Sequence, residues 1–113
     1  GRVQPMRASG LVELTRRRAG PALHELLTEP CASCIGGRAA DPVARAFAAL
    51  RALRAEAAVA PGKRPAIVCA PAITRALETG PAAAARTAVA ERLGFDVAVR
   101  PTPGQADFEI VLE

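Results

Sequence analysis

Prolines and glycines divide the chain after residue 40 into short segments, and this feature restricts the fold more than any other. They stand at Asp41-Pro42, 61–65, Pro71, Gly80-Pro81 and 101–104. Proline has no amide hydrogen and a fixed φ, so it is tolerated at the start of a helix but interrupts a helix or a central strand. Residues 41–113 are therefore expected to consist of short elements joined by tight connections.

The first of these elements is a helix that begins at Pro42, because Asp41 is a good N-cap and Pro42 fits the first helical position. Val43, Phe47, Leu50 and Ala57 lie on one face of it. The other expected elements are a buried strand over 66–70, a short helix over 71–77 ended by Gly80-Pro81, a helix over 82–93 ended by Gly94, and strands over 95–99 and 108–112.

This order of elements predicts an α+β domain over residues 41–113, with helices packed on a short mixed sheet. Its expected core consists of the apolar side chains on the helix and strand faces: Val43, Phe47, Leu50, Ile67, Ile73, Leu77, Leu93, Phe95, Phe108 and Ile110. Most other apolar residues are alanines, and the aromatic residues are three phenylalanines. We therefore expect ordinary or marginal stability, with help from a partner or a metal.

Residues 1–28 are predicted to form a separate segment with helical character. Leu11 and Leu14 recur at helical spacing, Gly20-Pro21 interrupts the pattern, and a short helical turn follows around Leu23. Residues 29–40 contain Pro30, two cysteines and Gly36-Gly37. This composition predicts a tight knuckle rather than a helix or a strand.

The balance of charge and the three cysteines indicate the compartment and the kind of partner. Lys and Arg outnumber Asp and Glu by 15 to 11, which suits contact with a polyanion. No apolar run approaches the length of about 20 residues that a membrane helix needs, and we expect neither a secretory leader nor contact with a membrane. An odd number of cysteines without a leader predicts a reducing, cytoplasmic location. Because the chain begins with Gly rather than Met, we expect it to be a piece of a longer protein.

The sharpest single motif is Cys31-Ala32-Ser33-Cys34. Two thiolates at this spacing can face one tetrahedral zinc ion, with sulfurs about 2.3 Å from the metal. The following glycines let backbone amides turn toward the sulfurs and offset their charge. Since structural zinc takes four protein ligands, the pair is half a site, and the other half must come from the same chain or from a second copy. A redox pair of the thioredoxin kind and two unrelated thiols are the alternatives.

Two segments in order resemble the ribonuclease E/G family of endoribonucleases. These are Gly10-Leu11-Val12-Glu13-Leu14-Thr15-Arg16-Arg17-Arg18 and Glu29-Pro30-Cys31-Ala32-Ser33-Cys34-Ile35-Gly36-Gly37. The family ends its catalytic region with a segment like the first, follows it with a knuckle like the second, and then adds a small domain. Here Ala32 replaces the proline that follows the first cysteine, and the second glycine of the family's GxG is shifted to Gly37.

The resemblance implies a different role for each of three segments of the chain. Residues 1–28 would be the tail end of the catalytic region, 29–40 a zinc-link knuckle, and 41–113 a small α+β assembly domain. Cys31 and Cys34 of two chains would share one zinc and link a homo-oligomer. The parent enzyme would be a magnesium-dependent hydrolase of single-stranded RNA in RNA processing and decay. Its magnesium ligands would lie upstream, so this segment alone is expected to carry no catalytic residue and to be inactive.

Four other residues are weaker candidates for binding. Arg16, Arg17 and Arg18 are candidates for contact with RNA phosphates, although on a helix at most two of them face the same strand. The alternative for them is a solvated helix end that favours positive charge. His24 is the only histidine and a weak candidate metal ligand.

The remaining titratable residues have structural explanations. Cys69 is expected to be a small buried apolar residue. Asp41 is expected to cap a helix, and Asp96 and Asp107 to lie at strand ends. The alternative to the nuclease hypothesis is a stand-alone α+β binding or interaction protein with a structural CxxC.

Overall fold

A three-stranded mixed sheet and three helices make up the larger part of the computed structural model, which describes residues 1–113. The elements are α2 (Pro42–Val59), β5 (Pro65–Cys69), α3 (Pro71–Glu78), α4 (Gly80–Leu93), β6 (Val99–Pro101) and β7 (Phe108–Leu112). The strand order is β6-β5-β7, with β5 parallel to β6 and antiparallel to β7. The fold is α+β, as predicted.

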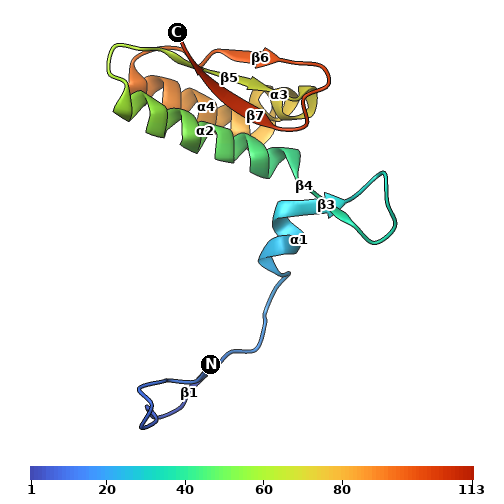
Figure 1. Ribbon diagram of the computed structural model, residues 1–113, viewed down its shortest axis with the longest axis vertical. Coiled ribbons are helices and arrows are strands. Elements are labelled where there is room, and N and C mark those ends of the chain that lie inside the picture. The colour runs from blue at the N-terminus through green and yellow to red at the C-terminus, as the bar shows by residue number, and fades with distance from the viewer.

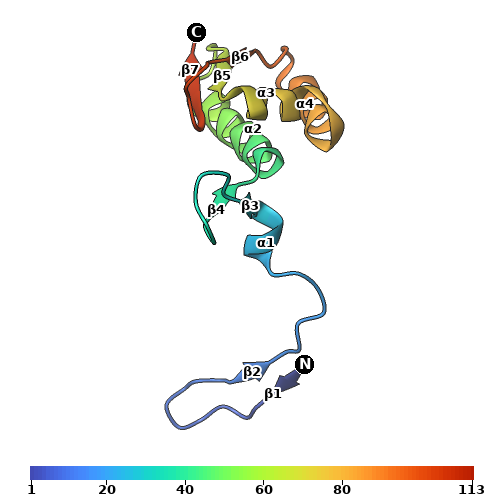
Figure 2. The ribbon, with the colours of Figure 1, turned by 90° about the vertical axis from the view of Figure 1, so that its right-hand side faces the viewer.

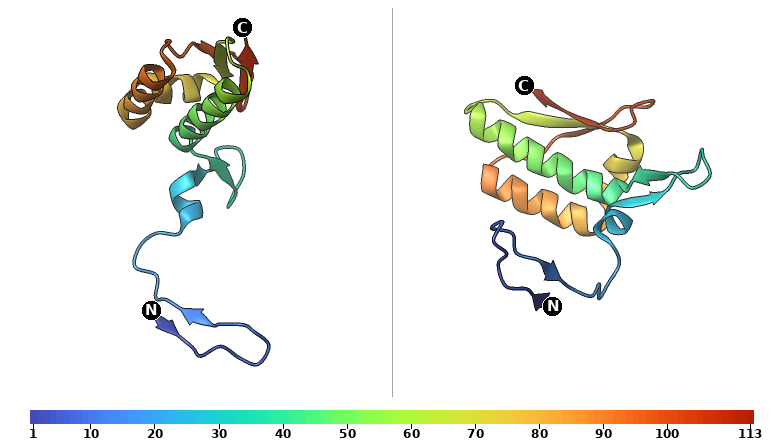
Figure 3. Two further views of the ribbon diagram at one scale, coloured as in Figure 1. Left: turned by 90° about the vertical axis from the view of Figure 1, so that its left-hand side faces the viewer. Right: turned by 60° about the horizontal axis from the view of Figure 1, so that its bottom comes forward.

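The helices form one layer and the sheet forms the other. Figures 1 and 3 show α2 and α4 side by side beneath the strands. Helix α2 packs against α3 and α4 and against strands β5 and β7, so it is the central element of the helical layer. The chain leaves β5, passes through α3 and α4, and returns in β6 parallel to β5. A parallel pair requires such a crossover.

The core lies between these two layers. Its buried apolar members are Ala46, Ala49, Leu50, Leu53, Ile67, Cys69, Ala70, Ile73, Leu77, Ala82, Val89 and Val97. Of the predicted core, Leu50, Ile67, Ile73 and Leu77 are buried. Phe47, Leu93, Phe108 and Ile110 are partly buried and pack against that core, and Phe95 is half-buried. The prediction that Val43 belongs to the core is wrong, because 38% of its surface is exposed in the first turn of α2.

Local signals place the start of α2 and the end of α4 where they were predicted. The Asp41 carboxylate accepts a hydrogen bond of 2.8 Å from the Ala44 amide, and Pro42 occupies the first turn of α2. Gly94 ends α4 in the left-handed conformation, with φ of 75°. Gly80-Pro81 does not end α3 as predicted but forms the first turn of α4. Proline is tolerated there because a first-turn amide has no partner inside the helix.

The strand predicted over 95–99 is wrong except at its last residue. Phe95–Ala98 carries the chain from the helical layer to the sheet, and β6 begins only at Val99. Within this connection Val97 is fully buried. The strand predicted over 108–112 is confirmed with the same bounds.

The N-terminal segment is extended rather than helical. Strand β1 (Arg2–Val3) pairs antiparallel with β2 (Leu14–Thr15), and the only helix here is α1 (Leu23–Leu27), at the predicted short turn. The helix expected around Leu11 is therefore wrong. Figures 1 and 2 show this two-stranded arm projecting away from the domain. Its apolar side chains are exposed, among them Leu11 at 69% and Leu14 at 66%.

A second hairpin lies between α1 and α2. Strands β3 (Thr28–Pro30) and β4 (Arg38–Ala40) pair antiparallel, with Glu29 opposite Ala39. The prediction that residues 29–40 contain no strand is therefore wrong at both ends of that segment. Within it, only residues 31–37 lack regular structure. No helix in the structure combines the length and apolar character needed to cross a membrane.

Candidate functional site

The loop at the tip of the β3–β4 hairpin brings the two predicted metal ligands together. The Cys31 amide donates a hydrogen bond of 2.9 Å to the Gly37 carbonyl and so closes the loop at its base. Gly36 has φ of 77°, a conformation that side chains disfavour, and it turns the chain back toward β4. Cys31 is half-buried and Cys34 is exposed. Both thiols are therefore accessible from outside the hairpin.

Gly37 makes room for one of the two sulfurs. A Cβ atom added to Gly37 would lie 2.3 Å from Cys34 Sγ and 3.5 Å from Cys31 Cβ. The Cys34 sulfur therefore lies directly against the backbone of Gly37, on the side where Cys31 also lies. Only glycine allows this approach, because any other residue would occupy the space of the sulfur. The sequence predicted that these glycines give backbone amides access to the sulfurs, but it did not predict this steric role.

Hydrogen bonds make Cys31 acidic. The Ser33 side chain, whose Oγ lies 3.6 Å from Cys31 Sγ, and then the Ser33 amide lower the pKa of the thiol from 9.0 to about 7, with further contributions from Cys34. Near neutral pH a large fraction of Cys31 is therefore thiolate. Thiolate, rather than thiol, is the form that binds metals.

Contacts behind the hairpin tie it to α1. The Arg38 guanidinium donates to the Thr28 carbonyl at 2.8 Å and reaches the Glu25 carbonyl at 3.5 Å. The Asp41 amide donates to the Leu27 carbonyl at 2.9 Å. Arg38 thereby satisfies carbonyl groups at the end of α1, where positive charge is favoured. The hairpin and α1 form one unit that carries the two cysteines.

The structure brings no third ligand to the two thiols. No three His, Cys, Asp or Glu side chains gather where a metal ion would fit. His24 is exposed on α1, whereas Cys69 is fully buried in β5, with its sulfur 3.2 Å from Thr74 Oγ1. The prediction that Cys69 is a small buried residue is confirmed. One chain thus offers two ligands of the four that structural zinc takes.

The arginines proposed to contact RNA lie apart from this loop. Arg16, Arg17 and Arg18 follow β2, have no regular structure and are exposed. The alternative of a helix end is wrong because no helix forms there. Basic residues dominate the arm, since Arg2 and Arg7 add to these three while Glu13 is the only acidic residue before Arg18. Glu13 pairs with Arg7 at 3.0 Å, which leaves the three successive arginines facing solvent.

The three aspartates have structural partners. Asp41 caps α2, Asp96 lies 3.8 Å from the Arg86 guanidinium, and Asp107 pairs with Arg45. The hydrogen bond from Arg45 is the main reason that the pKa of the Asp107 carboxyl lies below its usual value. The predicted capping role of Asp41 is confirmed, and Asp107 directly precedes β7 as expected.

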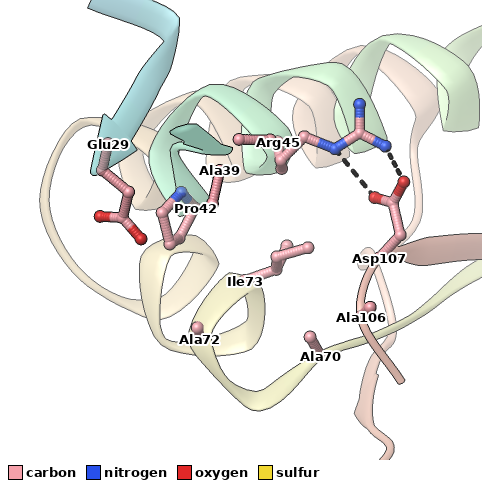
Figure 4. Close-up of a pocket in the computed structure, with 10 residues that line it drawn as sticks. Glu29, Ala39, Pro42, Arg45, Ala70, Ala72, Ile73, Ala106 and Asp107 are labelled. Atoms are coloured by element: carbon pink, nitrogen blue, oxygen red, sulfur yellow. Dashed lines mark hydrogen bonds and ion pairs between the residues drawn. The ribbon is translucent and has the colours of Figure 1, made fainter. Parts of the chain in front are cut away.

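A cavity of about 450 Å³ lies between the hairpin and the domain. Figure 4 shows its walls of alanine, proline and Ile73, with Glu29 at one end and the Arg45–Asp107 pair at the other. Arg45 Nε lies 2.8 Å from Asp107 Oδ1, and the guanidinium also stacks 4.9 Å from the centre of the Phe108 ring. These contacts join α2 to the start of β7. The cavity walls carry no nucleophile beside a base, so the cysteine loop remains the stronger candidate site.

The chain matches no protein-family model, and no characterised protein matches it in sequence.

Proposed function

We propose that this chain is the C-terminal segment of a ribonuclease E/G-type endoribonuclease, in which it supplies half of a zinc link between two protomers. The observation that carries the proposal is the pair of accessible thiols at the hairpin tip, placed between an arginine-rich arm and a small α+β domain. The order of these parts along the chain is the order that the resemblance of the two sequence segments implies.

The chemistry of the loop fits zinc. Thiolates are preferred zinc ligands, the Ser33 hydrogen bonds favour the thiolate form of Cys31, and Gly37 leaves space for the Cys34 sulfur. A second copy of the chain would complete the tetrahedral set with its own two cysteines. Zinc bound in this way would act as a structural cross-link, since no position is left open for water or substrate. The hairpin and α1 would then be the parts of each protomer nearest to the two-fold axis.

RNA cleavage belongs to the part of the parent protein that precedes this segment. Each aspartate here already has a structural role, which supports placing the magnesium ligands upstream. Arg16, Arg17 and Arg18 are exposed and are assigned to contacts with RNA phosphates. A cytoplasmic location is proposed with this function, since free thiols persist in a reducing compartment.

A stand-alone binding or interaction protein is the second candidate. It is favoured by the buried core, whose members all lie between residues 46 and 97, so that neither the arm nor the hairpin contributes to it. The coding sequence upstream of Gly1 distinguishes the two candidates. An S1-type RNA-binding domain and two spaced aspartates belong to the nuclease, whereas a start codon close to Gly1 belongs to the binding protein.

Cleavage of RNA by the parent protein tests the proposal. The purified parent is incubated with a single-stranded RNA and magnesium, beside Cys34→Ser and Cys69→Ala variants. The proposal predicts endonucleolytic products from the parent and from Cys69→Ala, and weaker cleavage with loss of the dimer from Cys34→Ser. A parent that leaves the RNA intact, or a Cys34→Ser variant that keeps full activity as a monomer, would contradict it.

A further inference from the structure

Two of the three cysteines are neighbours on an exposed loop, and the third is isolated in the core. The space beside Gly37 contains Cys34 Sγ and borders Cys31 Cβ, whereas Cys69 is fully buried and hydrogen-bonded to Thr74. We infer that Cys31 and Cys34 also form a reversible disulfide within one chain when a peroxide is present, and that this disulfide opens the link between protomers. The second part of this inference rests on the proposed zinc link, but the first part does not.

The loop geometry favours a bond within the chain. A disulfide requires Cβ atoms about 3.5–4.5 Å apart, so the two cysteines must already face each other. The Cys31–Gly37 hydrogen bond and the turn at Gly36 hold the loop closed, and the two side chains lie on the same side of Gly37. Closing the bond therefore needs rotation of two short side chains and little movement of the backbone. The β3–β4 pairing below the loop is left intact.

The reaction balances with hydrogen peroxide as the oxidant. The Cys31 thiolate attacks one peroxide oxygen, an S–O bond forms, the O–O bond breaks, and the departing hydroxide takes a proton to become water. Cys34 then attacks the Cys31 sulfur, the S–S bond forms, the S–O bond breaks, and a second water leaves. Two thiols are oxidised by two electrons in total, and one peroxide is reduced to two waters. A dithiol reductant reverses the change.

The disulfide competes directly with zinc for the same sulfur atoms. A metal ligand must be a thiolate, and neither sulfur of a disulfide is one. Oxidation of one chain would remove two of the four ligands of a shared zinc, and oxidation of both chains would remove all four. The hairpin would then sense oxidants, and the assembly of the parent protein would respond to them.

Peptide mapping tests the inference on the reduced protein. Trypsin cuts after Arg18 and Arg38, so one peptide of residues 19–38 carries both loop cysteines and Cys69 travels separately. After treatment with equimolar peroxide, the 19–38 peptide should be lighter by two hydrogen atoms, and the Cys69 peptide should be unchanged. Dithiothreitol should restore the original mass. Cys34→Ser should abolish this mass change, while Cys69→Ala should preserve it.

Zinc content and mass in solution are measured on the same samples before and after peroxide. Loss of all zinc and halving of the mass, both restored by dithiothreitol and zinc, support both parts of the inference. Mainly covalent dimers, a sulfinic acid on Cys31, or unreacted loop thiols would overturn it, even if the starting protein is a zinc-linked dimer. If the starting protein has no zinc but the loop disulfide still forms, the redox pair stands, and both the zinc link and its opening are wrong.

Discussion

Gly37→Ala should weaken zinc binding without unfolding the domain. The added Cβ would lie 2.3 Å from Cys34 Sγ, whereas heavy atoms in contact prefer separations of about 3.5–4.0 Å. The sulfur must therefore move by more than about 1 Å. Cys34 is exposed and its thiol turns about a single bond, so the side chain can rotate away at small cost to stability. The rotated sulfur, however, no longer lies beside Cys31.

The expected loss of zinc affinity follows from the position of Gly37 beside the Cys34 sulfur. Disturbing groups that orient metal ligands typically lowers metal affinity by about 10–100-fold. In the proposed link a shared zinc would contact Cys34 of both chains, so we expect the larger value, which corresponds to about 2.8 kcal/mol. The hairpin lies outside the core cluster. The free energy of unfolding of the domain should therefore change by less than about 0.5 kcal/mol.

Two other glycines provide matched controls. Gly36→Ala places a side chain at φ of 77° with no atom within 4 Å, so it strains the loop by about 1–2 kcal/mol without touching a sulfur. Gly20→Ala lies in open space with no such strain and should behave as wild type. Competition with a chromophoric chelator measures zinc affinity, and urea unfolding measures stability. Wild-type zinc affinity in Gly37→Ala would refute the assigned role of Gly37, and so would an effect no larger than that of Gly36→Ala.

Three further predictions concern the fold, the acid stability and the activity of the segment. Leu53→Ala should destabilise the domain by about 3 kcal/mol because Leu53 is fully buried, whereas Val43→Ala should cost less than about 0.5 kcal/mol because Val43 is exposed. The reverse order of the two costs in urea unfolding would show that the buried side chains of α2 are misassigned. The Arg45 hydrogen bond lowers the pKa of Asp107, so its contribution is present above the unfolded value of about 3.9 and is lost as pH falls through the folded value. The stability difference between wild type and Asp107→Asn should therefore shrink as the pH is lowered, and a difference independent of pH would contradict this. The segment alone should not cleave single-stranded RNA with magnesium, because no group of three or more His, Cys, Asp or Glu side chains could hold the metal. Specific cleavage that survives removal of contaminating nucleases would disprove this.

Local signals made much of the domain predictable. Asp41-Pro42 and Gly94 act within one turn of their helices, so their roles follow from the residues alone. The alternation of Phe108, Ile110 and neighbouring residues likewise marks the last strand, and its bounds agree with the structure. Such features depend on neighbours in sequence rather than on distant partners.

The incorrect predictions concern residues whose surroundings depend on elements distant in the sequence. Leu11 and Leu14 have helical spacing, but β2 exists because Arg2 and Val3 pair with it from the far side of a turn. Val43 stands two turns before the buried Leu50 and shares its side of α2, but it remains 38% exposed in the first turn, because spacing along a helix does not show where the elements that cover it end. Val97 is buried in a connection without periodicity, which no pattern of spacing reveals.

The candidate site likewise has features that the sequence predicted and features that it did not. The spacing of Cys31 and Cys34 predicted that their thiols lie near each other, and the loop brings them together. The space beside Gly37 was not predictable, because it depends on the direction of the Cys34 side chain after the β3–β4 strands have paired. The contact between Arg45 and Asp107 joins residues far apart in sequence, and charge alone did not identify it.

Zinc content measured together with mass in solution tests the central claim most directly. The samples are the parent protein and its Cys31→Ser variant, each purified in the presence of zinc and then dialysed. If two chains share one ion through Cys31 and Cys34, the parent should contain one zinc per two chains, and chelation should lower its mass. The variant should lose both the zinc and the zinc-dependent mass. A parent without zinc, one zinc per chain in a monomer, or a Cys31→Ser variant with unchanged zinc and mass would contradict the zinc link.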